Sequence, residues 1–185
     1  AGVDSARYFL FRGAPFGEDG DFSEQALIDR HNNELADKLG NLVSRVSALI
    51  EKYGFEKFDW EKSENEVLIN RNIAFTNMNF FTIKFKNLYF ISIALQKSVE
   101  KHFDNYELDK VLNEIFAFID ICNEYVQNKR PWETGDKKVL YELVESIKII
   151  AKLLSPFIPE SAEKIIKQFN SKRITKGDVL FKKIK

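Results

Sequence analysis

The sequence predicts an all-α protein, built as an antiparallel bundle of long helices. Apolar residues recur at three- and four-residue spacing over most of the chain, which is the period of a helix with one buried face. The four prolines stand at or beyond the ends of these periodic stretches, where a proline ends a helix. Most connections are short, so successive helices are expected to run antiparallel.

The first expected helix runs from Val3 to Arg12, and the helix breakers Gly13 and Gly17 follow it. The next stretch is the acidic run Glu18–Asp21. It lacks the later ligands of a calcium loop, so we interpret it as a turn. Asp21 or Ser23 can then cap the helix that follows. No metal site is expected here.

The longest helix is expected from about residue 23 to residue 52, a stretch without proline. Gly40 lies inside it and costs about 1 kcal/mol relative to alanine, which indicates a close backbone approach. The pair Tyr53-Gly54 ends the helix. Its apolar positions keep the helical period: Leu27, Ile28, Leu35, Leu39, Leu42, Val46, Leu49 and Ile50.

The second half of the chain continues the helical pattern after a loop at 55–64. Residues 66–85 are interpreted as helical, although alternation at Phe81, Ile83 and Phe85 resembles a strand. Residues 171–185 are basic and broken by glycine, and we expect a tail or the start of a connection. Clearer helices are expected at 86–103, 107–129, 136–154 and 160–169.

Composition restricts the kind of protein and its compartment. The formal net charge is zero, so any polyanionic partner must be held by a local patch. Cys122 is the only cysteine and lies in an apolar helical stretch, so we expect a buried, unreactive thiol and a reducing compartment, the cytoplasm. No signal peptide or membrane-length apolar run is present. The chain begins at Ala1 rather than Met, and we expect a piece of a longer protein.

The sequence contains no recognisable catalytic set. It has no glycine-rich phosphate loop, no G-x-S-x-G motif and no histidine pair at metal-binding spacing. His31 and His102 are expected on helix surfaces. We therefore predict no catalytic and no metal-binding residues, and the remaining candidates suit recognition.

Asn41, Arg45 and Trp132 are the candidate recognition residues. Asn41 and Arg45 stand one helical turn apart, away from the apolar stripe, and their side-chain types hydrogen-bond base edges. Trp132 follows Pro131 beyond a helix end, where an indole either packs back onto the core or stacks on an unpaired base. Lys129 and Arg130 precede it. They are candidate phosphate contacts, although basic residues also favour the end of a helix dipole.

Four motifs in order resemble the methionyl-tRNA synthetases, class I aminoacyl-tRNA synthetases. Residues 6–10 (ARYFL) and 14–22 (APFGEDGDF) are similar to the segment that follows the catalytic core in that family. Residues 33–45 (NELADKLGNLVSR) resemble the first helix of its anticodon-binding domain. Residues 123–126 (NEYV) with Pro131-Trp132, and residues 153–160 (LLSPFIPE), resemble two later signatures. The resemblance covers about residues 3–169.

The resemblance implies a function and a role for each candidate. It implies a junction from the end of the catalytic core at 1–22, a helical anticodon-binding domain at 23–170, and the tail at 171–185. Asn41 and Arg45 would contact anticodon bases, and Trp132 would stack on the first base of the CAU anticodon of a methionine tRNA. The parent enzyme would ligate methionine to that tRNA with ATP and Mg in a linked catalytic domain. The family's H-I-G-H and K-M-S-K-S signatures are absent, so that chemistry is expected outside this chain.

Two alternatives remain open from the sequence. One is the equivalent domain of another class I synthetase, for leucine, isoleucine, valine or cysteine. The other is a helical protein-interaction domain without an RNA role, in which Asn41, Arg45 and Trp132 need not come together. A large separation between Trp132 and Arg45 would favour the second alternative.

Overall fold

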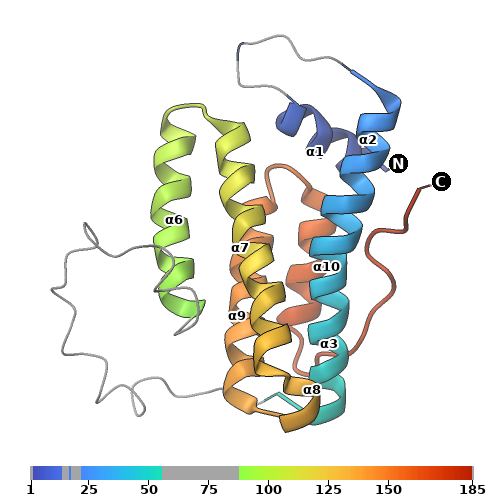
Figure 1. Ribbon diagram of the computed structural model, residues 1–185, viewed down its shortest axis with the longest axis vertical. Coiled ribbons are helices and arrows are strands. Elements are labelled where there is room, and N and C mark those ends of the chain that lie inside the picture. The colour runs from blue at the N-terminus through green and yellow to red at the C-terminus, as the bar shows by residue number, and fades with distance from the viewer. Residues whose placement is uncertain (1, 14–16, 18–21, 56–87, 185) are drawn as a thin grey trace, which may run out of the picture.

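Every regular element in the described part of the chain is a helix, as the sequence predicts (Figure 1). A computed structural model describes residues 2–13, 17, 22–55 and 88–184. The interpretations of Glu18–Asp21 and of residues 56–85 lie outside them. The elements are α1 (Val3–Gly13), α2 (Glu24–Arg30), η1 (His31–Gly40), α3 (Asn41–Tyr53), α6 (Leu88–Asp104), α7 (Leu108–Lys129), α8 (Pro131–Thr134), α9 (Lys137–Leu154) and α10 (Pro159–Phe169).

The long first helix is continuous from Glu24 to Tyr53, but its middle third, η1, is wound as a π-helix. The backbone N–H of Asn41 bonds to the carbonyl of Ala36, five residues earlier. A Cβ on Gly40 would lie 3.2 Å from the carbonyl oxygen of Leu35 and 3.6 Å from the Phe181 ring. The expected close approach at Gly40 is therefore present, and glycine fits where the wide turn meets the C-terminal segment.

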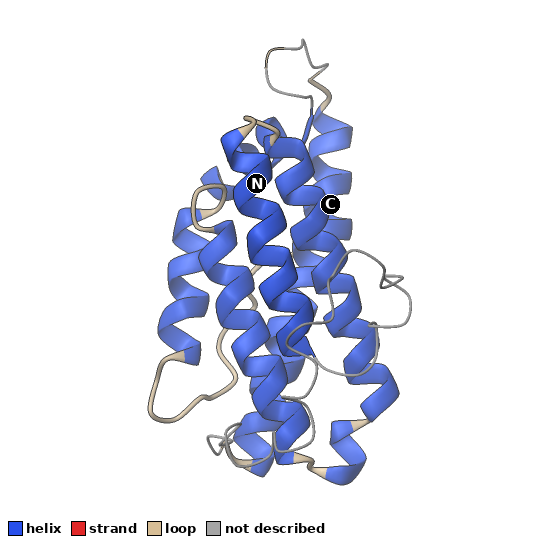
Figure 2. Ribbon diagram, turned by 90° about the vertical axis from the view of Figure 1, so that its left-hand side faces the viewer, coloured by secondary structure: helices blue, strands red, loops and turns tan. Residues whose placement is uncertain are grey.

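The helices pack into one bundle whose successive members run antiparallel (Figures 1 and 2). The long helix of residues 24–53 and α7 are not successive, because α6 comes between them in the chain. They lie side by side and run in the same direction, since contacts pair Lys38 with Asp120 and Arg45 with Gln127 in ascending order. This parallel pair forms the surface on which the candidate residues lie.

The buried stripe follows the predicted periodicity on α3, α7 and α9, but not on the short helices at the start of the chain: Val3 and Leu10 of α1, expected as apolar positions, are 68% and 69% exposed, and α2 buries no residue. On the long helix Leu35, Leu39, Leu42 and Val46 are fully buried, and on α7 the stripe runs from Val111 to Val126. Helix starts follow the expected chemistry. Ser23 caps α2 by accepting the N–H of Ala26, and Pro159 stands in the first turn of α10.

Polar contacts attach helix α1 to the end of the bundle where α9 turns into α10. The carboxylate of Asp4 accepts the N–H of Ser161 at 2.7 Å, at the start of α10. Arg7 donates to the carbonyls of Pro156 and Phe157 in the turn between α9 and α10. The segment before the long helix is thus part of the same packed body.

The C-terminal segment (residues 171–184) lies along the bundle beside α3 and η1, without helix or strand (Figure 1). Ile174 and Phe181 are buried. The N–H of Lys176 donates to Glu51, and Asn32 exchanges two hydrogen bonds with the backbone of Ile184. The segment therefore runs antiparallel to the long helix and is held at both ends.

The structure corrects the expectation for His31 and confirms the one for Cys122. His31 is 5% exposed rather than on the surface, because its ring nitrogens bond to the Ser5 hydroxyl and the Lys182 carbonyl, both at 2.8 Å. These partners lie far away in the sequence. His102 is half-buried between Glu107 and Glu114. Cys122 is fully buried as expected, and burial raises the pKa of its thiol.

Candidate nucleic-acid interface

A polar groove of about 540 Å³ separates α3 from α7, and Asn41 and Arg45 lie in it. Both belong to α3, where four-residue spacing places them on one side of the helix. Asn41 is exposed and Arg45 is half-buried. The groove is lined by Asp37, Lys38, Asn41, Arg45, Asp120, Asn123, Glu124, Gln127 and Asn128. We call it the α3–α7 groove.

Arg45 links the groove to Trp132. Its guanidinium carbon lies 5.7 Å from the centre of the Trp132 ring, which is within cation–π range. When the side-chain amide of Gln127 is turned so that its oxygen faces Arg45, which is the orientation that satisfies both groups, this oxygen accepts from both terminal nitrogens of Arg45, at 3.2 and 3.3 Å. Two long helices and the α8 turn therefore meet at one guanidinium. Arg45 and Trp132 therefore lie close together, which the alternative of a protein-interaction domain does not require.

Trp132 is partly buried against the core, so both of its expected roles are compatible with its position. It stands in α8, a single turn that the sequence did not predict. Arg130 and Gly135, with φ of 46° and 62°, bracket this turn in the left-handed region. The Tyr53 hydroxyl donates to the Trp132 carbonyl at 2.5 Å, and a Cβ on Gly135 would meet the Tyr53 ring at 3.0 Å. The end of α3 therefore holds the indole in place.

The two candidate phosphate contacts point differently. The ammonium of Lys129 lies 5.6 Å from the ring centre of Tyr125, which is on the side of α7 away from Gln127. Arg130 is exposed at the corner between α7 and α8, with Glu133 at 3.7 Å. Their role as phosphate contacts remains a prediction.

The charges of the α3–α7 groove suit bases better than phosphates. Lys38 is paired with Asp120 at 2.7 Å, and Lys183 with Asp37 at 2.8 Å. Arg45 is left with the neutral Gln127 and Trp132. Carboxylates repel phosphate, but they accept hydrogen bonds from base edges, and side-chain amides both accept from and donate to them. Among the described residues no cluster of His, Cys, Asp and Glu is arranged to hold a metal ion.

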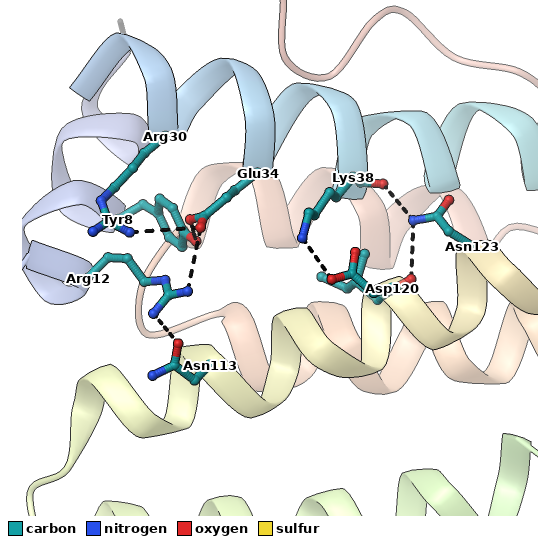
Figure 3. A network of polar contacts seen from close by, with 9 residues as sticks. Tyr8, Arg12, Arg30, Glu34, Lys38, Asn113, Asp120 and Asn123 are labelled. Carbon is teal, nitrogen blue, oxygen red and sulfur yellow. Dashed lines mark hydrogen bonds and ion pairs between the residues drawn. The ribbon is translucent and has the colours of Figure 1, made fainter. Parts of the chain in front are cut away.

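Polar contacts fix η1 before it leads into Asn41 (Figure 3). The amide of Asn123 donates to the carbonyls of Lys38 and Ile119, which ties α7 to the last turn of η1. Further along, Glu34 of η1 accepts from the Tyr8 hydroxyl and lies beside Arg12 and Arg30. Asn41 and Arg45 thus stand on a helix that polar contacts fix to both α1 and α7.

The groove side of α7 is what sequence reasoning missed. Asp120, Asn123, Glu124 and Gln127 follow one another at spacings of three, one and three, so they form a polar stripe opposite the buried one. That stripe was readable from the helical period. The sequence did not show that this stripe faces α3, because the parallel arrangement of α3 and α7 depends on the whole bundle.

Two family models match the chain. The family described as the anticodon-binding domain of tRNA ligase matches residues 86–183, and the family described as tRNA synthetases class I (M) matches residues 1–47. Together they cover both sides of the α3–α7 groove. In the described residues no helix is long and apolar enough to cross a membrane.

Curated relatives and solved structures agree with these matches. The chain is 32% identical to a methionine–tRNA ligase of Caldanaerobacter subterraneus subsp. tengcongensis, over 99% of this chain and 30% of the relative. It is 34% identical to that of Rickettsia conorii, over 98% and 34%. The Mycobacterium tuberculosis methionyl-tRNA synthetase in its free state is 26% identical, with a TM-score of 0.72, over 100% of this chain and 39% of that one. The chain thus spans about a third of these proteins.

Proposed function

The chain belongs to the anticodon-binding domains of tRNA ligases, in the methionyl-tRNA synthetase family, and on that premise we propose that it recognises the CAU anticodon of a methionine tRNA. The observation that carries the proposal is the meeting of Arg45, Gln127 and Trp132 at one end of the α3–α7 groove. The bases of an anticodon loop are unpaired, so they can be splayed out, stacked and read on their edges.

Each residue then has a distinct task. Trp132 stacks on the first anticodon base, a contact worth about 1–3 kcal/mol. Asn41 and Arg45 hydrogen-bond the edges of the bases that enter the groove, each worth about 1–3 kcal/mol of discrimination. Lys129 and Arg130 contact the neighbouring phosphates. The rigid α3 and its bond to α8 hold the readers in position before RNA binds.

The activity of the whole enzyme follows from the same premise. We propose that a linked catalytic domain joins methionine to this tRNA with ATP and Mg, in the cytoplasm, and that the present chain supplies selection rather than chemistry. A solved relative of M. tuberculosis is described as bound by methionyl-adenylate, which supports ATP use by the parent. Aminoacylation of a methionine tRNA by the intact enzyme tests this part of the proposal.

The binding test uses the 185-residue chain and a labelled anticodon stem-loop RNA, measured by fluorescence anisotropy at low salt. The CAU loop should bind more tightly than a loop with guanine as the first anticodon base. Trp132→Ala should weaken CAU binding by about 5- to 150-fold and reduce the preference for the first base. Asn41→Ala and Arg45→Gln should weaken CAU binding by a similar factor and reduce the preference for the anticodon bases that these residues contact.

Asn33→Ala is a matched control, because Asn33 is exposed on the same long helix outside the groove. It should leave binding unchanged. Equal affinity of the wild-type chain for the two loops would contradict CAU recognition. A wild-type preference for the anticodon of leucine, isoleucine, valine or cysteine tRNA would instead assign the domain to that synthetase.

A further inference from the structure

The α3–α7 groove offers too little positive charge to hold the phosphate backbone of an RNA. An RNA hairpin carries a phosphate at every nucleotide, and its affinity for proteins comes largely from lysine and arginine contacts that release counterions. In the groove, Lys38 is already paired with Asp120, and Arg45 is occupied by Gln127 and Trp132. Cations that hold the backbone should therefore lie next to the groove.

Three such cations gather where the C-terminal segment begins. Lys172, Arg173 and Lys176 fall within five residues, and all three are exposed. No described acidic side chain pairs with theirs. Glu51 accepts the backbone N–H of Lys176 rather than its ammonium, and Asp178 follows two residues along the chain. We call Lys172, Arg173 and Lys176 the cationic bend.

The cationic bend is held by the bundle. Ile174 lies within it and is 3% exposed. The Gln168 amide of α10 donates to the carbonyl of Thr175 at 2.8 Å, and Glu51 of α3 accepts from the N–H of Lys176 at 3.1 Å. The three charges are thus carried on a backbone fixed to both α3 and α10.

The helical positions on α3 place the bend beside the groove. Asn41, Arg45 and Lys52 stand at spacings of four and seven, so they follow one side of the helix down to its last turn. Tyr53 turns to one flank, where it bonds the carbonyl of Trp132. Glu51 turns to the other flank, where it bonds the cationic bend. The reading stripe on α3 therefore lies between Trp132 on one side and the bend on the other.

Lys52 completes this arrangement. It is exposed in the last turn of α3, below Arg45, and its ammonium lies 4.7 Å from the ring centre of Tyr53. A phosphate chain that leaves the groove at Trp132 meets Lys52 first and the bend next. Helix α6 lies on the opposite side of the bundle from α3 (Figure 1).

We propose that Lys52 and the cationic bend hold the phosphate backbone of the anticodon arm while the α3–α7 groove reads its bases. The proposal rests on the proposed function, because the same RNA must enter the groove. The two surfaces have separate duties. The groove sets which anticodon binds, and the bend sets how tightly any anticodon arm binds and how strongly salt weakens it.

The test compares a bend variant, Lys172→Gln/Arg173→Gln/Lys176→Gln, with a matched control, Lys97→Gln/Lys101→Gln/Lys152→Gln. The control removes three exposed lysines on α6 and α9. Binding of the CAU stem-loop and of the loop with a changed first base is measured in the 185-residue chain across about 50–200 mM salt. Circular dichroism confirms that both variants stay folded.

The bend variant should weaken the binding of both RNAs by the same factor. Near 0.1 M salt we expect a decrease of about 5- to 8-fold for each phosphate that the variant no longer neutralises, and a salt dependence of log K that is flatter by about 0.7–0.9 for each such phosphate. The control should change neither quantity. Lys52→Gln should act like one member of the bend.

The outcomes separate the two proposals. If the bend variant keeps wild-type affinity and salt slope while the CAU preference persists, the inference is wrong and the proposed function stands. If the bend variant weakens only the CAU loop, the bend reads bases and the backbone assignment is wrong. If it loses binding to polyglutamate but not to RNA, the surface serves an acidic protein. Wild-type chain without a preference for CAU contradicts the proposed function itself.

Discussion

Removing the Tyr53 hydroxyl tests how Trp132 is held in place. Helix α8 has a single turn, which is too short to be stable on its own, so its position depends on outside contacts. The Tyr53 hydroxyl donates to the carbonyl of Trp132 at 2.5 Å, and the ring beneath it packs on Gly135. Tyr53→Phe keeps the ring and deletes only the hydrogen bond.

The expected effect on stability is about 1–2 kcal/mol. A hydrogen bond contributes about 0.5–1.5 kcal/mol, and a partly buried carbonyl left without its donor adds a desolvation cost. For a chain of this size each kcal/mol lowers the melting temperature by about 2–4 °C. Thermal denaturation followed by circular dichroism should therefore show a decrease of about 2–8 °C. Tyr53→Leu, which also removes the ring from Gly135, should cost more.

The same substitution should affect RNA binding through Trp132. Affinity for the CAU stem-loop should fall by about 3- to 10-fold, less than for Trp132→Ala, because the indole is loosened rather than removed. A double-mutant cycle isolates the coupling: in a Trp132→Ala background, Tyr53→Phe should have no further effect on RNA affinity. A single variant with lower stability and wild-type RNA affinity would refute the reasoning, since α8 would then hold its indole without the bond.

Three further predictions concern the interior and the C-terminal segment. Burial raises the pKa of Glu142 above its usual value of 4.5, so the folded state binds this proton more tightly than the unfolded chain. The free energy of unfolding should therefore fall as pH rises above 4.5 through the raised pKa of the folded state, and urea titrations should show a flatter pH dependence in Glu142→Gln. Cys122 should react with a maleimide only in denaturant, because burial raises the pKa of its thiol. Phe181→Ala should cost about 3–5 kcal/mol and speed trypsin cleavage in the C-terminal segment, whereas Val179→Ala, at a 62% exposed position, should do neither.

Helix positions were predictable because each long helix buries enough apolar residues to repeat its period several times. The expected ends at Arg12, Lys129, Leu154 and Phe169 agree with the structure to within a residue. The π-helical winding of η1 was not predictable, because its buried residues His31, Leu35 and Leu39 keep a four-residue spacing that an α-helix also allows. Helix α8 has only four residues, about one turn, so no apolar pattern can repeat within it.

Interactions between distant segments limited the rest of the prediction. His31 looks like a surface histidine until Ser5 and the carbonyl of Lys182 are brought to its two nitrogens. The C-terminal segment looks like a tail because its two buried apolar residues, Ile174 and Phe181, form no repeating pattern, and its other contacts are made to distant parts of the chain. Both features depend on segments more than 25 residues away in the sequence, which no local period records.

The candidate site was also predictable only in part. Asn41, Arg45 and Trp132 were identified from resemblance, but the resemblance does not explain how an arginine is kept from pairing with the carboxylates around it. In the structure, two of the three carboxylates that line the groove, Asp120 and Asp37, pair with Lys38 and Lys183, and Arg45 contacts the uncharged Gln127 and Trp132. A guanidinium held by an amide and a ring is released more easily than one in an ion pair, because no charge is left unpaired when it turns to a base.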